Sequence, residues 1–245
     1  MSKTLLIIAV VSLIITASAG AETIRLCGSS TVTKKVISKI QEPFKQATGI
    51  ELAVNPNGSG NGAKDLLAGS CDASMASESL QELQRALAGL SSPDVKAHVV
   101  AEDEIKIFVN KANPVAKLSR EQVKGLHTGK IKNWKEVGGA DSEVVVVTSS
   151  KGSGNRSAFM GLAMNGEPYS SDAVETATDV AELKEVSTMK ESISAIGEAF
   201  INDTVKVIET PKIARQLLII TKGEPKPGVT KLLAYIGNDG QKYLK

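Results

Sequence analysis

One glycine-serine motif, GSGN, occurs twice in the sequence, within Asn57-Gly58-Ser59-Gly60-Asn61-Gly62 and within Lys151-Gly152-Ser153-Gly154-Asn155-Arg156. Each copy follows an extended apolar stretch and precedes a segment with helical periodicity. A strand that passes through a glycine turn into a helix is the repeating unit of α/β folds. The repeated turn therefore predicts an α/β fold in which two such units have the same loop chemistry.

Strand-like and helix-like segments alternate on both sides of the two turns. Strands are predicted at 23–27, 50–54, 73–76, 95–100, 105–110, 144–148, 205–208 and 217–221. Helices are predicted at 31–47, 63–68, 80–89, 120–126, 157–164 and 231–235. This alternation favours mixed, mostly parallel sheets.

The glycine-serine turns suit a small anion. Ligands of open α/β sheets sit beyond the carboxyl ends of strands, where loops lead into helices. Gly28-Ser29-Ser30-Thr31 forms a third loop of the same make-up. Glycine lets backbone N–H groups approach closely, hydroxyls add donors, and a helix N-terminus carries partial positive charge. Two copies of the turn would allow two domains to grip one anion from opposite sides.

Composition excludes several other kinds of partner. The formal net charge is +2, which argues against a general nucleic-acid or anionic-membrane surface. Aromatic residues make up 3% of the chain, too few to favour stacking sites for bases. Hydrophobic residues make up 42%, enough for one large core or two ordinary ones.

Residues 1–21 read as a secretory signal peptide. Lys3 is their only charge, an apolar run follows, and small residues stand at the cleavage positions from Ala17 to Ala21. Cys27 lacks the small residues expected before a lipid-anchored cysteine, so we predict no membrane anchor.

Competing site chemistries fit less well. Gly58-x-Gly60-x-x-Ala63 matches a loose dinucleotide fingerprint but leaves the second turn unexplained. A phosphate-binding P-loop fails because Lys64 is followed by Asp65.

The sequence does not show the residue patterns that hydrolysis and metal binding require. A catalytic Ser59 or Ser153 would need a base, and His98 and His127 are the histidines of the chain. No cluster of His, Cys and carboxylates has metal-ligand spacing. We therefore expect no catalytic residue, no metal and no cofactor.

An ordered set of motifs resembles one family, the periplasmic phosphate-binding components of bacterial phosphate ABC transporters. The matching segments are 28–32, 57–62, 72–77, 107–110, 113–115, 129–139, 152–159 and 195–197. The segment around Trp134, GKIKNWKEVGG, is the most specific of them.

The resemblance implies a two-lobe periplasmic binding protein of type II, with two crossover strands and the ligand in the cleft between the lobes. We place the crossings near 105–110 and 217–221. Lobe 1 would hold 22–106 and 217–245, and lobe 2 would hold 107–216.

Carried over position by position, the resemblance also implies a set of ligand contacts. They are Ser30, Thr31, Ser59, Gly60, Ser77, Glu78, Ser153, Gly154, Asn155 and Arg156. Arg156 would supply the main full positive charge in the cleft. Glu78 would accept a hydrogen bond from a protonated ligand oxygen, and sulfate has no such proton to donate. The alternative interpretation of both Arg156 and Glu78 is a solvent-exposed helix residue with no role in binding.

The chain departs from the family pattern at four positions. Ser149 stands where the family usually has arginine, and Asn155 replaces a common threonine. Glu78 follows Ser77 where arginine or aspartate is usual, and Glu198 stands in place of a tyrosine. Loss of the arginine removes a bidentate charge-assisted pair, so the ligand could be another oxyanion.

The two cysteines, Cys27 and Cys71, would form a disulfide by default in an oxidising compartment. The resemblance instead places them on adjacent parallel strands, offset by four residues, or roughly 13 Å. That spacing favours free thiols.

The predicted function is capture of inorganic phosphate, or a similar tetrahedral oxyanion, by a non-enzymatic periplasmic protein that delivers it to an inner-membrane ABC permease. A monomer is expected. The alternatives are an exported sensor or scavenger of the same fold, or, in a different class, a periplasmic phosphatase.

Overall fold

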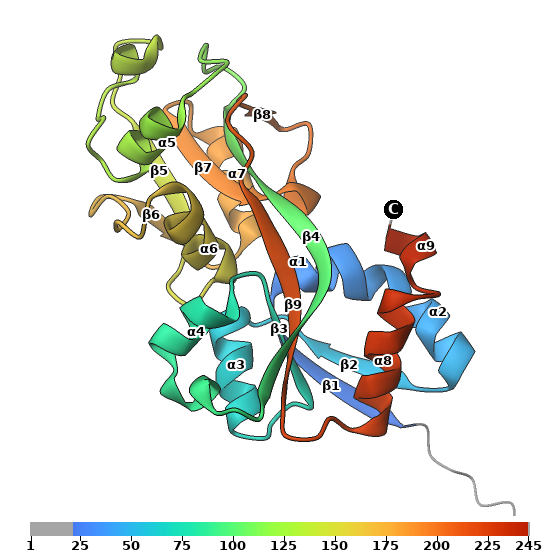
Figure 1. The fold of residues 1–245 in the computed structure, drawn as a ribbon. Helices are drawn as coiled ribbons and strands as arrows, with labels where there is room; N and C mark the ends of the chain where they lie inside the picture. Colours follow the sequence, from blue (N-terminus) through green and yellow to red (C-terminus); the bar gives the residue numbers. More distant parts are fainter. Residues whose placement is uncertain (1–21, 245) are drawn as a thin grey trace, which may run out of the picture.

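The computed structural model describes residues 22–244, so the signal peptide predicted at 1–21 lies outside the described residues. Within this range the chain alternates strands and helices, as expected for an α/β protein (Figure 1). The strands are β1 (Thr23–Gly28), β2 (Glu51–Asn55), β3 (Ala73–Ala76), β4 (Val95–Asn110), β5 (Val145–Ser149), β6 (Val174–Thr176), β7 (Ser192–Gly197), β8 (Val205–Val207) and β9 (Ala214–Lys222).

The helices cover the strands and connect them. They are α1 (Ser30–Val32), α2 (Ser38–Thr48), α3 (Ser59–Leu67), α4 (Leu80–Ala86), α5 (Arg120–His127), α6 (Gly154–Ala163), α7 (Asp179–Thr188), α8 (Pro227–Gly237) and α9 (Gln241–Leu244). A π-helical turn, η1 (Thr33–Ile37), joins α1 to α2, so the helix predicted at 31–47 is helical throughout. Short 3₁₀ turns are η2 (Ala88–Ser91), η3 (Trp134–Val137) and η4 (Glu198–Phe200).

One mixed sheet runs through the described part of the chain in the order β2-β1-β3-β9-β4-β7-β5-β6, with β8 paired to β4. The pairs β1–β2, β1–β3, β5–β6 and β5–β7 are parallel. Every pair that includes β4 or β9 is antiparallel. The parallel strands at the two ends of the sheet therefore form two separate α/β units.

β4 and β9 are the two crossover strands, and they run side by side through the middle of the molecule (Figure 1). Their pairing ends at Glu104↔Ala214, and from Ile105 onward β4 pairs with β7 instead. The separate strands predicted at 95–100 and 105–110 are one strand, which corrects that expectation. The residues between the two predicted strands, 101–104, are paired to β9.

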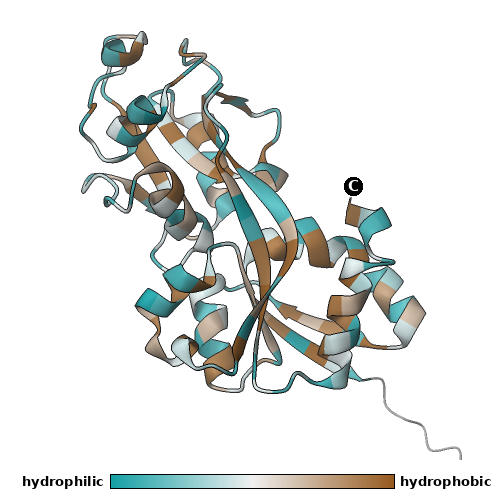
Figure 2. Cartoon of the chain, viewed as in Figure 1, coloured by the Kyte–Doolittle hydropathy of each residue, from teal (hydrophilic) through white to brown (hydrophobic). Residues whose placement is uncertain are grey.

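Each half of the sheet has its own hydrophobic core. One core packs β1, β3 and β9 against α2 and α8, and the other packs β4 and β7 against α5 and α6. Figure 2 shows apolar residues concentrated on the strands of both halves. The lobe boundaries that we predicted, at 106/107 and 216/217, fall within β4 and β9; the exact division stays a prediction.

Cys27 and Cys71 are buried and free, as expected. Strands β1 and β3 are adjacent and parallel, but the register aligns Cys27 with Ser74. The offset from Cys71 is thus three residues instead of the four that we predicted. Both side chains lie in one cluster with Ala63 and Leu66.

Among residues 22–244, no helix combines the length and apolar character needed to cross a membrane.

Candidate anion-binding site

Four helices begin at one cavity. Their N-cap residues are Ser29 for α1, Gly58 for α3, Ser153 for α6 and Thr178 for α7, and all four line a cavity of about 290 Å³. This volume lies at the low end of the roughly 300–1,000 Å³ typical of ligand pockets. Converging helix N-termini present unpaired N–H groups and partial positive charge. The cavity is therefore suited to a small anion.

The strand order explains why the helix N-termini meet. β1 leads into α1, β2 into α3, β5 into α6 and β6 into α7, and within each half these strands are parallel. Parallel strands end at the same edge of a sheet, so the loops that follow them lie together. Close packing adds to this: a Cβ on Gly62 would lie 2.4 Å from the Gly28 Cα, so only glycine lets α3 approach β1 this closely.

The N-cap hydroxyls keep their hydrogens for a ligand. Ser29 Oγ accepts from Val32 N at 3.2 Å and Thr178 Oγ1 accepts from Ala181 N at 3.1 Å. Ser153 Oγ accepts from its own helix in the same way, at 3.4 Å. A hydroxyl that accepts through oxygen can still donate its hydrogen. Serine caps thus fix the helix starts and add donors to the cavity.

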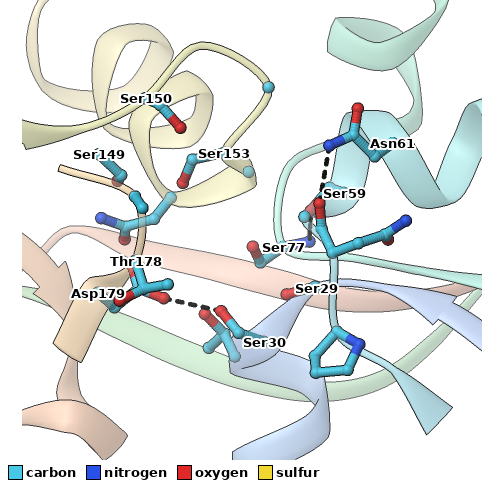
Figure 3. A pocket seen from close by; sticks show the side chains of 18 of the residues that line it. Ser29, Ser30, Ser59, Asn61, Ser77, Ser149, Ser150, Ser153, Thr178 and Asp179 are labelled. Atoms are coloured by element: carbon cyan, nitrogen blue, oxygen red, sulfur yellow. Dashed lines mark hydrogen bonds between the residues drawn. The ribbon is translucent and has the colours of Figure 1, made fainter. Parts of the chain in front are cut away.

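The two halves touch across the cavity. The Gly60 N–H donates to the Gly152 carbonyl oxygen at 3.3 Å, so the two copies of the repeated turn contact each other. Ser30 Oγ donates to Asp179 Oδ2 at 2.8 Å (Figure 3). A Cβ on Gly154 would lie 2.1 Å from Ser59 Oγ. The structure is therefore closed around the cavity.

Among the described residues, the charged groups that line the cavity are Lys151 and Asp179. Lys151 is exposed, whereas Asp179 is 5% exposed. A second cation lies just beneath: Arg215 Nη1 donates to the Ser77 carbonyl oxygen at 3.3 Å, and Nη2 to Thr31 Oγ1 at 3.4 Å. Arg215 also pairs with the buried Asp103 at 2.8 Å, and the other oxygen of that carboxylate pairs with Lys35 at 3.0 Å.

Two carboxyl groups on α7 face this region one turn apart. Burial raises the pKa of Asp179, and the Ser30 hydroxyl and Arg215 act in the opposite direction. Burial also raises the pKa of Glu182, to about 8. The hydrogen bond from the Ser194 hydroxyl lowers this pKa but does not outweigh burial. Near neutral pH, Glu182 is therefore protonated and does not add a second negative charge behind Asp179.

The structure brings together most of the residues that the sequence predicted for the site. Those that line the cavity are Ser30, Thr31, Ser59, Ser77, Ser153, Gly154 and Asn155. Gly60 is adjacent, with its N–H engaged by Gly152.

Arg156 and Glu78 are not among the lining residues, which corrects the geometry that we expected. Arg156 Nη1 donates to the Ser149 carbonyl oxygen at 2.9 Å and pairs with Glu175 at 2.9 Å. Its guanidinium also stacks 4.9 Å from the centre of the Tyr169 ring. Glu78 lines a second cavity of about 370 Å³ beside Arg215, and burial raises its pKa to about 8.

Sequence reasoning missed several lining residues. They include Ser29, Asn57, Asn61, Ser149, Ser150, Lys151, Thr178 and Asp179. Lys151 stands inside the quoted turn, and Thr178-Asp179 carries the sequence signal of a helix start. Arg215, by contrast, is recognisable only once β9 is seen to pass beneath the cavity.

Within residues 22–244 no group of three or more His, Cys, Asp or Glu side chains is arranged to hold a metal ion.

Comparisons with known proteins agree with this architecture. A family model described as the PBP superfamily domain matches residues 16–239. The "Phosphate-binding protein PstS 2" of Streptococcus agalactiae is 36% identical over 113 residues, which cover 46% of this chain and 36% of that protein. The chain spans between about a third and about half of the curated relatives that it matches.

Two solved structures extend the similarity over nearly the whole chain. A putative phosphate ABC transporter substrate-binding protein with bound phosphate, from Clostridium perfringens, has a TM-score of 0.80 and 26% identity, covering 91% of this chain and 96% of that one. An ABC-type phosphate transport receptor from Vibrio cholerae has a TM-score of 0.72 and 25% identity, with the same coverage.

Proposed function

The chain belongs to the PBP superfamily, and from that premise we propose that it is an extracytoplasmic binding protein that captures inorganic phosphate for an ABC transporter. The observation that carries the proposal is the convergence of four helix N-termini on one closed, hydroxyl-lined cavity. The names of the relatives and the phosphate bound to one similar structure support it.

Backbone N–H groups and hydroxyls would carry most of the binding. The first turns of α3 and α6 approach from opposite halves, so a tetrahedral anion between them is met on both sides. Lys151 would add an exposed full charge at the rim, and Arg215 would orient Thr31 and Ser77 from below. Such a site needs no bidentate arginine, which accounts for Ser149 in the position where the resemblance expects one.

Asp179 takes the role that we had expected of Glu78. Its Oδ2 accepts from Ser30, whereas its buried Oδ1 has no hydrogen-bond partner within residues 22–244 and belongs to a lining residue. A phosphate hydroxyl would donate to that oxygen. Sulfate carries no proton near neutral pH, so it would leave Asp179 Oδ1 unpaired and would be repelled by the carboxylate. Both effects weaken sulfate binding.

Delivery to an inner-membrane permease and a periplasmic location follow from the same proposal. A sensor or scavenger would use the same site, and binding alone does not separate these roles. A phosphatase is less well supported, because the lining residues include no histidine or cysteine to serve as base or nucleophile.

Isothermal titration with phosphate and sulfate at neutral pH tests the proposal. We expect phosphate to bind at least about a hundredfold more tightly, and Asp179→Asn to narrow that ratio by about tenfold or more, the scale of a hydrogen bond to a charged group. Asp203→Asn, at an exposed aspartate, is the control and should change nothing. Failure of the wild-type protein to bind phosphate, or rapid turnover of a chromogenic phosphate ester, would overturn the proposal.

A further inference from the structure

The cavity is lined by hydrogen-bond acceptors that have no donor in the described part of the chain, although an anion is bound mainly by donors. Oδ1 of Asp179, Oδ1 of Asn155 and Oδ1 of Asn57 are buried, belong to lining residues and have no hydrogen-bond partner among the described residues. Buried polar atoms in native proteins are nearly always paired. The three oxygens therefore indicate a ligand that donates hydrogen bonds as well as accepting them.

The orientation of these groups is fixed by their other contacts. Asn155 Nδ2 donates to the Ala195 carbonyl oxygen at 2.7 Å, so turning the amide over would set two acceptors against each other. Asn57 Nδ2 is held in the same way by Asp65 Oδ2 at 2.8 Å. Asp179 Oδ2 already accepts from Ser30 at 2.8 Å. The free oxygens are thus acceptors that a simple amide flip cannot convert into donors.

The two departures from the family pattern at this cavity act in the same direction. Ser149 stands where the resemblance implies an arginine, so that cation is missing. Asn155 stands where it implies a threonine, so an amide acceptor takes the place of a hydroxyl donor. With Lys151 exposed and Asp179 buried, the lining offers little to balance a second negative charge on the ligand. A ligand with less charge and more hydrogens fits better.

We infer that the cavity selects monobasic phosphate, H₂PO₄⁻, over the dibasic ion, with the two ligand hydroxyls donating to Asp179 Oδ1 and Asn155 Oδ1. Of the three buried acceptors, dibasic phosphate, with one hydroxyl, leaves two unpaired, whereas the monobasic ion leaves only Asn57 Oδ1. The dibasic ion also adds a charge near Asp179. The inference rests on the proposed function and names the ionisation state of its ligand.

Other titratable groups near Asp179 have to be separated from the ligand. Arg215 and Asp103 face it from β9 and β4 as an ion pair, and Ser30 faces it from α1. Glu182 lies behind it on α7, among Ser194, Ser149 and the charge of Arg156. Because its pKa is raised to about 8, Glu182 is neutral below that pH and ionises above it. Ionised Glu182 would weaken anion binding further, so a variant without it is needed.

Calorimetric titration of the full chain with inorganic phosphate, between about pH 6 and about pH 8 at constant ionic strength, tests the selection. The apparent dissociation constant should rise by about tenfold per pH unit once the pH exceeds the second pKa of phosphate, because the monobasic fraction falls by that factor. Repeating the titration at the higher pH in buffers of different ionisation enthalpy should show uptake of about one proton per phosphate bound.

Glu78→Gln removes the other carboxyl group whose pKa is about 8. Glu182→Gln then distinguishes the ligand from Glu182 as the site of proton uptake. The proton count should stay near one in this variant if the ligand is the acceptor of the proton, and fall toward zero if Glu182 is. Glu185→Gln, one turn further along α7, is the matched control. A wild-type affinity that is level across this pH range with no proton uptake refutes the selection but keeps phosphate binding. Absence of phosphate binding at every pH refutes the proposed function instead.

Asn155→Thr tests the second acceptor. Restoring a hydroxyl donor should let the dibasic ion bind. Between about pH 6 and about pH 8 the affinity of the variant should therefore fall about tenfold less than that of the wild type, and binding should take up less than one proton. Asn202→Thr, at an exposed asparagine of the same half, should match the wild type. An unchanged pH profile in Asn155→Thr overturns the role of Asn155. If that variant fails to fold, the wild-type proton count still decides the selection.

Discussion

At the residue scale, Glu182 shows how a buried carboxyl links folding to pH. The side chain is 1% exposed, Ser194 donates to Oε1, and Oε2 has no partner among the described residues. Its pKa is about 8 in the folded protein against an ordinary value of 4.5, mainly because burial disfavours the charged form. Folding therefore takes up a proton between those values, and the free energy of unfolding falls as pH rises through this window.

Glu182→Gln should remove that loss. The slope of unfolding free energy against pH should become less negative, by up to about 1.4 kcal/mol per pH unit between about pH 5 and about pH 8. Glu78, whose pKa is also about 8, would preserve part of the decline in both proteins. Urea unfolding at several pH values measures the slopes. Equal slopes in variant and wild type would show that Glu182 is not buried as a neutral acid.

The predicted site residues that line the cavity are those whose positions are set by local chemistry. Ser59 and Ser153 stand in turns whose glycines force the chain toward the cavity, so their positions follow from the motif. Arg156 lies in the same motif, but its side chain is long enough to reach Glu175 and Tyr169 instead. Asp179 depends on where α7 docks against the first half, which no neighbouring residue indicates.

At the element scale, α6 is the part of the second half that enters the cavity. It begins at Gly154, three residues before the predicted start at 157, because Ser153 is the N-cap and the turn itself supplies the first helical amides. Gly154 faces Ser59 and Ser77 across the cavity. Any side chain there would keep the two halves apart.

Gly154→Ala should therefore weaken phosphate binding by about a hundredfold or more, because the new Cβ would lie 2.1 Å from Ser59 Oγ and 2.9 Å from Ser59 Cβ. Its thermal stability should change little, since glycine in a helix is replaced by a better helix former. Gly237→Ala, in helix α8, is the control, because its Cβ would meet nothing within 4 Å. Similar affinities in the two variants would contradict the close approach at Gly154.

Elements were predictable where apolar residues are continuous and not where polar residues are buried. β1, β3, β9 and α5 are found near their predicted positions. β7 and α7 were missed, since Ser192 and Ser194 are buried in β7, and Asp179 and Glu182 are buried in α7. Buried polar residues hide the pattern on which such predictions depend, and here they surround the candidate site.

At the scale of the whole molecule, the crossover strands carry a charge pair that bonds residues of the first half at the cavity. Arg215 of β9 bonds Asp103 of β4 and, beyond the strands, reaches Ser77 and Thr31. The pairing of β4 changes from β9 to β7 at the next residues, so the pair lies where the chain passes between the halves. Both side chains are almost fully buried, at 2% and 0% exposed.

Arg215→Met should cost roughly 3–5 kcal/mol of unfolding free energy, because it leaves a buried carboxylate with Lys35 as its remaining cation, at 3.0 Å. The control Lys117→Met breaks the exposed pair with Glu209, whose side chains are 73% and 70% exposed, and should cost less than about 1 kcal/mol. Adding Asp103→Asn to Arg215→Met should recover part of the loss, since the unpaired charge is then gone. Urea unfolding of the wild type and these three variants measures the costs. An Arg215→Met cost no larger than that of Lys117→Met would mean that strand pairing alone holds the crossing and that the buried pair of Arg215 and Asp103 adds nothing to it.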